Sequence, residues 1–138
     1  KGAPGVVAGV RSRQQYLEDN LGWYARSAAA IQELSPGERA LMLWEPRSLY
    51  CLPVCSPDEI LDRWRGDLRT WGDAQSVLAA WREAGYTHLL FYKTGADFVR
   101  QDDSRYTPQE WQALDELLAG LPAPQQFGEA YALYRISR

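Results

Sequence analysis

Apolar residues recur along this chain at two kinds of spacing, which predict helices and strands in alternation. From Ser12 to Leu34 the apolar residues alternate steps of three and four, so they share one face of a helix. That helix ends at Ser35-Pro36-Gly37, because proline cannot continue a helix and glycine suits the turn. The face consists of Leu17, Leu21, Tyr24, Ala28, Ile31 and Leu34.

Three short apolar runs predict strands. Ala40–Trp44 is a continuous apolar run, which is typical of a strand buried on both faces. His88–Tyr92 predicts a second strand and Tyr131–Ile136 a last one, with a small hairpin near Gly128 as one way for it to join.

Capping residues predict the helices between these strands. Ser56, Pro57 and Glu59 form a capping-box pattern, so we expect a short helix that ends near Gly66. Residues 74–84 form the next helix, with Asp73 as N-cap and Gly85 at its end, and Thr107 opens another. We expect residues 93–106 to be a long polar loop.

The order helix, strand, helix, helix, strand, helix, strand favours a small layered α/β domain. We expect a mostly parallel sheet of three to four strands, flanked by helices, with a right-handed crossover between the first two strands. The last strand can join in either direction. Residues 1–12 are interpreted as a flexible leader and residues 13–138 as a single domain.

Composition removes several classes of function. The 138 residues carry a formal net charge of -3, so the basic excess of a general nucleic-acid-binding surface is missing. The chain has no glycine-rich nucleotide motif and no nucleophile elbow, so we predict no cofactor. His88 is the only histidine, and with two cysteines it cannot complete a four-ligand Cys/His zinc site.

The end of the first predicted strand is the best candidate for a functional surface. Ligands of open α/β sheets bind outside the carboxyl ends of the strands. Glu45, Arg47 and Tyr50 follow the first strand, and Tyr92 and Asp97 end or follow the second. We predict these five residues as contact residues for a glycan, a peptide or another part of the protein.

Catalysis by these groups is a weaker interpretation. Glu45 with Asp97 or Asp102 would resemble a glycosidase pair if the carboxyl groups lay about 5–10 Å apart. The simpler interpretation is that Glu45 pairs with Arg47 or a neighbouring turn, while Asp102 and Asp103 are solvated loop charges. For His88, a structural hydrogen bond near the start of a strand is preferred over a general base. No residue is assigned as catalytic.

Aromatic residues divide into two groups. Trp64, Trp81 and Trp111 lie on the apolar faces of predicted helices, so we expect them in the core. Trp71 and Tyr106 lie in or near loops and are further candidates for contact.

The order of several segments resembles a known family. The segments are Tyr16-Leu17, Leu34–Gly37, Leu41–Arg47 with Tyr50, Ala84–Leu90 and Tyr131–Ile136. Together they resemble the C-terminal soluble domain of bacterial polytopic membrane glycosyltransferases. These enzymes are related to dolichyl-phosphate-mannose protein mannosyltransferases and aminoarabinose transferases.

The resemblance implies a function and a place. The enzyme would use a polyprenyl-phosphate sugar, and its catalytic acid would lie in the membrane region, so no catalytic residue transfers to this chain. The domain would lie at the cell membrane on the extracytoplasmic side, with the membrane-embedded part of the same polypeptide as partner. A glycan or a lipid-linked sugar is a further possible partner.

The two cysteines, Cys51 and Cys55, leave two alternatives open. A disulfide across this short loop would add about 2 kcal/mol by chain entropy, and the other state is a pair of reduced thiols. The extracytoplasmic location that the resemblance implies favours the disulfide.

Overall fold

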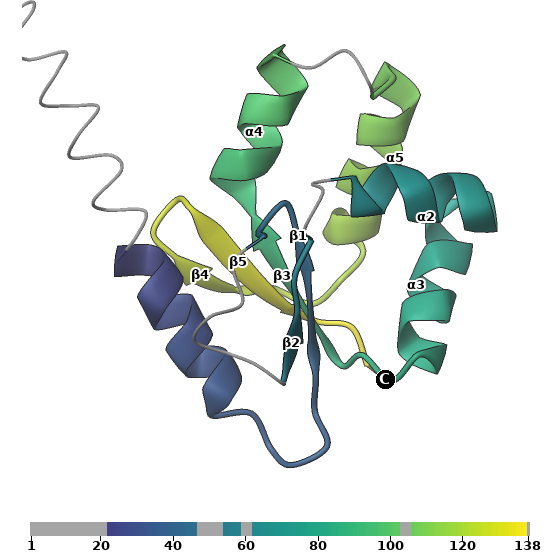
Figure 1. The fold of residues 1–138 in the computed structure, drawn as a ribbon. Helices are drawn as coiled ribbons and strands as arrows, with labels where there is room; N and C mark the ends of the chain where they lie inside the picture. Colours follow the sequence, from purple (N-terminus) through teal and green to yellow (C-terminus); the bar gives the residue numbers. More distant parts are fainter. Residues whose placement is uncertain (1–21, 47–53, 59–61, 103–105, 138) are drawn as a thin grey trace, which may run out of the picture.

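A five-stranded sheet forms the centre of the domain (Figure 1). The computed structural model describes residues 22–46, 54–58, 62–102 and 106–137. The strand order is β2-β1-β3-β5-β4. The strands are β1 (Ala40–Leu43), β2 (Cys55–Ser56), β3 (His88–Tyr92), β4 (Gln125–Phe127) and β5 (Tyr131–Arg135).

The sheet is mixed, so the expected α/β class is confirmed but the mostly parallel sheet of three to four strands is not. β1 pairs in parallel with both β2 and β3. β5 runs antiparallel to β3 and to β4. The hairpin expected near Gly128 is present, and Gly128 adopts a φ of 60° in its turn. This hairpin delivers β5 in the antiparallel direction, because a short turn can join only antiparallel strands.

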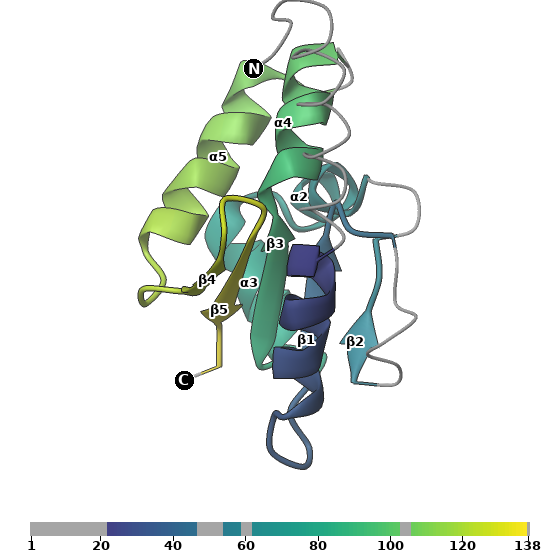
Figure 2. The same cartoon turned by 90° about the vertical axis from the view of Figure 1, so that its left-hand side faces the viewer.

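Helices cover both faces of the sheet. Residues 22–32 are helical, and we call this segment the N-terminal helix. The others are α2 (Arg63–Trp71), α3 (Ala74–Glu83), α4 (Lys93–Asp102) and α5 (Pro108–Ala119). Figures 1 and 2 show α2, α3 and α5 on one face and the N-terminal helix on the other. Among the described residues, none of the helices has the length and apolar character needed to cross a membrane.

Each face has its own apolar core. On the face of the N-terminal helix, Tyr24, Ala28 and Ile31 pack with Met42 and Leu90 of the sheet. On the other face, the three tryptophans predicted for the core are buried as expected. They are Trp64, Trp81 and Trp111, with exposed fractions of 0%, 4% and 7%.

The first prediction that the structure overturns is the loop expected over residues 93–106, because Lys93–Asp102 form the helix α4. Ala96 and Val99 are the apolar residues that this helix buries in the core, and two positions are too few to show a helical period in the sequence. Gly95 of this helix allows close packing, because a Cβ atom there would lie 2.7 Å from Tyr92 Cδ2 and 3.0 Å from the Trp44 carbonyl oxygen.

The second overturned prediction is the position of α2. The helix was expected to begin at Ser56 and end near Gly66, but it spans Arg63–Trp71 and contains Gly66. The N-terminal backbone of α2 is bound by the side chain of Asp58, not by Ser56. Residues 59–61, including Glu59, lie outside the described residues.

The predicted caps at Asp73, Gly85 and Thr107 are confirmed, whereas the predicted start of the first helix at Ser12 lies outside the described residues. Asp73 Oδ1 accepts the backbone N–H of Ser76, and Thr107 forms a full capping box with Glu110. Gly85, with a φ of 99°, ends α3 in a Schellman motif, in which its N–H and that of Tyr86 bond carbonyls of the last turn.

Candidate functional site

The backbone turns at Trp44 and Glu45, directly after β1, and hydrogen bonds to Asp58 hold this turn in place; we call it the fastened turn. Trp44 has a φ of 62°, a left-handed conformation that costs energy for a bulky residue and persists only where the surroundings hold it. The Trp44 N–H donates to Asp58 Oδ2 at 2.9 Å, and the Asp58 N–H donates to the Glu45 carbonyl oxygen at 2.9 Å. These reciprocal bonds hold the turn against the segment that follows β2.

Asp58 is the centre of this arrangement. Its second oxygen, Oδ1, accepts the backbone N–H groups of Asp62 and Arg63 at 3.2 Å each. The side chain is only 1% exposed, and this burial raises the pKa of the Asp58 carboxyl, while the bond from Trp44 and the charge of Arg63 oppose the shift. One carboxylate therefore joins the end of β1 to the start of α2.

The Arg63 guanidinium adds hydrogen bonds to backbone carbonyl groups near this turn. It donates to the carbonyl oxygens of Met42, Ser56 and Pro57, at 3.3, 3.3 and 3.0 Å. These acceptors belong to β1, to β2 and to the residue after β2. Arg63 therefore satisfies backbone groups at the end of the sheet where the two parallel strands finish.

Two of the predicted contact residues, Glu45 and Tyr92, are brought together through a third residue. Glu45 is fully buried and accepts a hydrogen bond from the Tyr131 hydroxyl. The Tyr131 ring stacks on the Tyr92 ring with centroids 4.6 Å apart and an interplanar angle of 14°. Glu45 thus faces the interior of the domain, and Tyr92 is half-buried beside it.

The remaining predicted contact residues lie elsewhere. Asp97 is exposed on α4, next to Phe98, which is 56% exposed. The structure does not pair Asp97 with the buried Glu45 in a common pocket among those described. Arg47 and Tyr50 lie outside the described residues. Cys51 does as well, so the Cys51–Cys55 disulfide stays a prediction, although Cys55 itself is buried.

His88 lies at the opposite end of β3. It is 8% exposed, and its Nδ1 lies 2.9 Å from the Thr87 hydroxyl. Burial lowers the pKa of His88, and the charge of Glu38 only partly opposes this shift. The arrangement agrees with the structural interpretation of this histidine.

An aromatic cluster beside the fastened turn was not predicted as a unit. Trp44 stacks on Trp111 at 5.2 Å and contacts Tyr106 and Phe91, each at 5.8 Å between centroids. Tyr106 is only 6% exposed, so its prediction as a contact residue was wrong. Trp71, by contrast, is 51% exposed.

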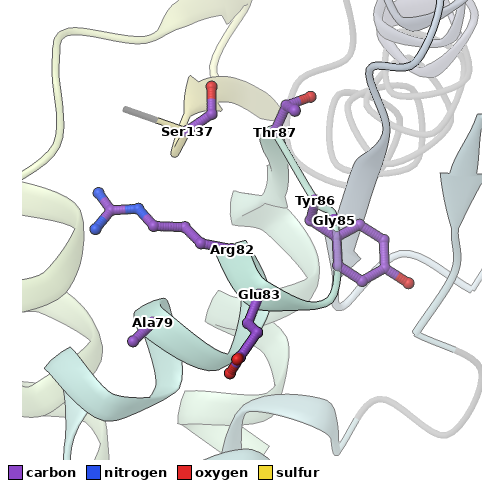
Figure 3. A pocket seen from close by; sticks show the side chains of 7 residues that line it. All are labelled: Ala79, Arg82, Glu83, Gly85, Tyr86, Thr87 and Ser137. Atoms are coloured by element: carbon purple, nitrogen blue, oxygen red, sulfur yellow. The ribbon is translucent and has the colours of Figure 1, made fainter.

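An open pocket lies at the other end of the sheet (Figure 3). Its volume is about 580 Å³, and its lining comes from the end of α3, the turn into β3 and the residue before the last. The Arg82 Nε–H donates to the Ile136 carbonyl oxygen, and the Ser137 hydroxyl has no hydrogen-bond partner among the described residues. The lining residues are Ala79, Arg82, Glu83, Gly85, Tyr86, Thr87 and Ser137.

One observation limits the metal chemistry of the described part of the chain. It contains no group of three His, Cys, Asp or Glu side chains that could hold a metal ion.

The residues that organise the strand end, Asp58, Arg63 and Tyr131, were not predicted. Nothing in a single sequence distinguishes Asp58 from the other polar residues of its segment, and Tyr131 reads as an ordinary strand residue.

Comparison of the chain with protein-family models, with curated proteins and with solved structures found no match.

Proposed function

We propose that this chain is the non-catalytic, extracytoplasmic C-terminal domain of a bacterial polytopic membrane glycosyltransferase that uses a polyprenyl-phosphate sugar. One observation carries the proposal. Four segments of the resemblance lie in the described residues. Residues 34–37 form the turn after the N-terminal helix, and the other three, which are residues 41–46, 84–90 and 131–136, overlap β1, β3 and β5. These are the three adjacent central strands of the sheet, so the resemblance involves the part that defines the fold.

The internal use of the acid and base candidates supports a non-catalytic role. Glu45 is buried against the Tyr131 hydroxyl, and both oxygens of Asp58 accept backbone N–H groups. His88 is buried beside Thr87 at the far end of β3. A general acid or base must reach the proton that it transfers, and a group buried in a structural bond does not.

In this role the domain covers the active site of the membrane-embedded part or helps to bind the acceptor. Asp97, exposed on α4, and the predicted residues Arg47 and Tyr50 belong to the contact surface. The domain acts from the extracytoplasmic side of the cell membrane.

The test compares three forms of the protein encoded by the complete gene. Full-length enzyme, enzyme without residues 22–138, and the isolated domain are each assayed in membrane vesicles with a polyprenyl-phosphate sugar and an acceptor. We expect transfer by the full-length enzyme, strongly reduced transfer without the domain, and none by the domain alone. Transfer or hydrolysis by the isolated domain refutes the proposal, as does a complete gene without apolar segments of about 20 residues.

A second candidate, a glycan- or peptide-binding module, is favoured by the open pocket. The lining of the pocket combines one aromatic residue, Tyr86, with charged and hydroxyl-bearing residues, a mixture that suits sugars and peptides. Titration of the labelled domain with glycans and acceptor peptides tests it by NMR. Shifts at Tyr86 and Thr87 would place a ligand in this pocket, shifts at Tyr92 would place it at the strand ends, and unmoved signals at all three would refute binding.

A further inference from the structure

Trp44 combines two unfavourable features in the fastened turn. Its φ of 62° is a left-handed conformation, which a bulky residue adopts only where its surroundings impose it. Its side chain is 1% exposed, yet the indole Nε1–H has no hydrogen-bond partner in the described part of the chain. A buried donor without an acceptor destabilises the conformation that contains it. Trp44 therefore stays in this conformation only because other groups hold it there.

A single carboxylate holds Trp44. The Trp44 N–H donates to Asp58 Oδ2 at 2.9 Å, and Asp58 Oδ1 accepts the N–H groups of Asp62 and Arg63. Three donors thus converge on two oxygens, which suits an ionised carboxylate because both of its oxygens only accept. A proton on Oδ1 would meet two N–H groups, whereas a proton on Oδ2 meets one. The bond from Trp44 is therefore the one that protonation removes.

We propose that the fastened turn is a proton-controlled switch: when Asp58 takes up a proton, the Trp44 N–H is released and the turn opens, while the rest of the domain stays folded. The left-handed φ and the unpartnered indole N–H of Trp44 favour this release, because both can be relieved once the bond to Asp58 is lost. The isolated domain would show this opening whether or not it belongs to a glycosyltransferase.

The surroundings of Asp58 bring its protonation above the ordinary range of an aspartate. Burial raises the pKa of the Asp58 carboxyl, while the bond from Trp44 and the charge of Arg63 oppose this shift. The preceding residues Ser56 and Pro57 carry no charge. Because the raised pKa belongs to the folded state, the folded domain takes up this proton before the unfolded chain does, so uptake does not unfold the domain.

Two other carboxyl groups belong to the elements that pack against Asp58. Asp62, at the start of α2, forms an ion pair with Arg65 at 3.3 Å. Glu45, at the end of β1, is fully buried and accepts the Tyr131 hydroxyl. Neither carboxyl group accepts the Trp44 N–H, so the switch is assigned to Asp58.

Opening of the turn would affect the helices at the carboxyl ends of the strands. The Trp44 carbonyl oxygen lies against Gly95 of α4, only 3.0 Å from where a Cβ atom would be, and the Trp44 ring stacks on Trp111 of α5. Trp44 thus connects β1 to both helices, and Figure 1 shows α4 beyond the end of β3. Release of Trp44 would loosen α4, which carries the predicted contact residue Asp97.

Hydrogen exchange of the Trp44 backbone amide measures the opening directly. NMR follows this exchange in the complete 138-residue chain. The pH is lowered from about 7 to about 4, close to the ordinary pKa of an aspartate. The protection factor, which corrects for the intrinsic pH dependence of exchange, should fall about tenfold further at Trp44 than at the amides of β3, as expected for the loss of one bond to a charged group. The amides of β3 report on global unfolding, including the effect of His88.

Two variants and one further measurement identify the group responsible. Asp58→Asn should show low protection of the Trp44 amide throughout this pH range, and Glu45→Gln should retain the pH dependence, since its amide oxygen can still accept the Tyr131 hydroxyl. In the wild type, the NMR shift of the Asp58 carboxyl carbon should titrate with the same midpoint as the protection of Trp44, a comparison that needs no variant.

Several results would overturn the switch. They are an unchanged protection of Trp44, an equal loss at Trp44 and in β3, a midpoint that differs from that of the Asp58 carboxyl, and a loss of the pH dependence in Glu45→Gln. The first shows that the turn stays closed, the second shows global unfolding, and the other two assign the proton to another group.

Discussion

Replacing Asp58 with asparagine tests whether one carboxylate fastens the end of β1 to the start of α2. In the native domain Oδ2 accepts the Trp44 N–H, while Oδ1 accepts the N–H groups of Asp62 and Arg63. Asparagine has a single carbonyl oxygen, and its amide nitrogen is a donor. Whichever way the side chain turns, an NH2 group faces at least one backbone donor.

The cost follows from the orientation that retains more bonds. The amide oxygen then keeps the two N–H groups at the start of α2, and the buried N–H of Trp44 is left without its acceptor. An unsatisfied buried donor costs about 1–3 kcal/mol, and bonds to a charged group are stronger than neutral ones. The neutral amide is easier to bury than the carboxylate, so we expect a net loss of about 2 kcal/mol. For a domain of this size this lowers the Tm by about 6 °C.

Urea unfolding at pH 7, followed by tryptophan fluorescence, measures this loss, and Asp73→Asn is the matched control. The control substitution also replaces an aspartate with an asparagine. Asp73, however, is an N-cap that accepts the backbone N–H of Ser76 through one oxygen. Asparagine caps helices as well as aspartate does, so the control variant should remain close to the wild type. If Asp58→Asn is no more destabilising than the control, the fastened turn does not depend on this carboxylate.

Three further predictions concern packing, protonation and the cysteines. Gly95→Ala should destabilise the domain by about 1–3 kcal/mol, because the new Cβ would meet Tyr92 and the Trp44 carbonyl oxygen. Gly66→Ala, which has open space in α2, should stabilise the domain by about 0.5–1 kcal/mol, and thermal melts of both variants compare the two effects. The lowered pKa of His88 means that the unfolded chain takes up the proton first, so stability should fall as the pH decreases below about 6.5, and His88→Asn should remove this slope in urea titrations. Thiol counting after unfolding without reductant should find no free thiol if Cys51 and Cys55 are bridged, and two thiols would contradict the disulfide.

The elements that could be predicted are those with strong local signals. The three central strands coincide with continuous apolar runs, since strands buried on both faces contain few polar residues. The caps at Asp73 and Thr107 were predicted because a capping side chain satisfies backbone groups of its own helix. Such signals need no knowledge of the rest of the fold.

What could not be predicted depends on contacts between distant parts of the chain. α4 buries two apolar side chains in the core, those of Ala96 and Val99, so its sequence resembles a polar loop until the neighbouring elements are in place. β4 (Gln125–Phe127) has one buried residue and is recognised as a strand only through its pairing with β5. Likewise, the direction of β5 depends on the hairpin, and its own residues are compatible with either direction.

In the candidate site too, residue positions could be predicted from the sequence, whereas side-chain contacts between distant parts of the chain could not. Position alone placed Glu45 at the strand end, but whether its carboxylate faces solvent depends on Tyr131, 86 residues further along the chain. With Glu45 bonded to Tyr131 and Asp58 bonded to three backbone donors, the polar groups at the strand ends are used to close the domain. A ligand or partner that binds at the strand ends would therefore meet exposed groups such as Asp97 on α4, and not the buried carboxylates.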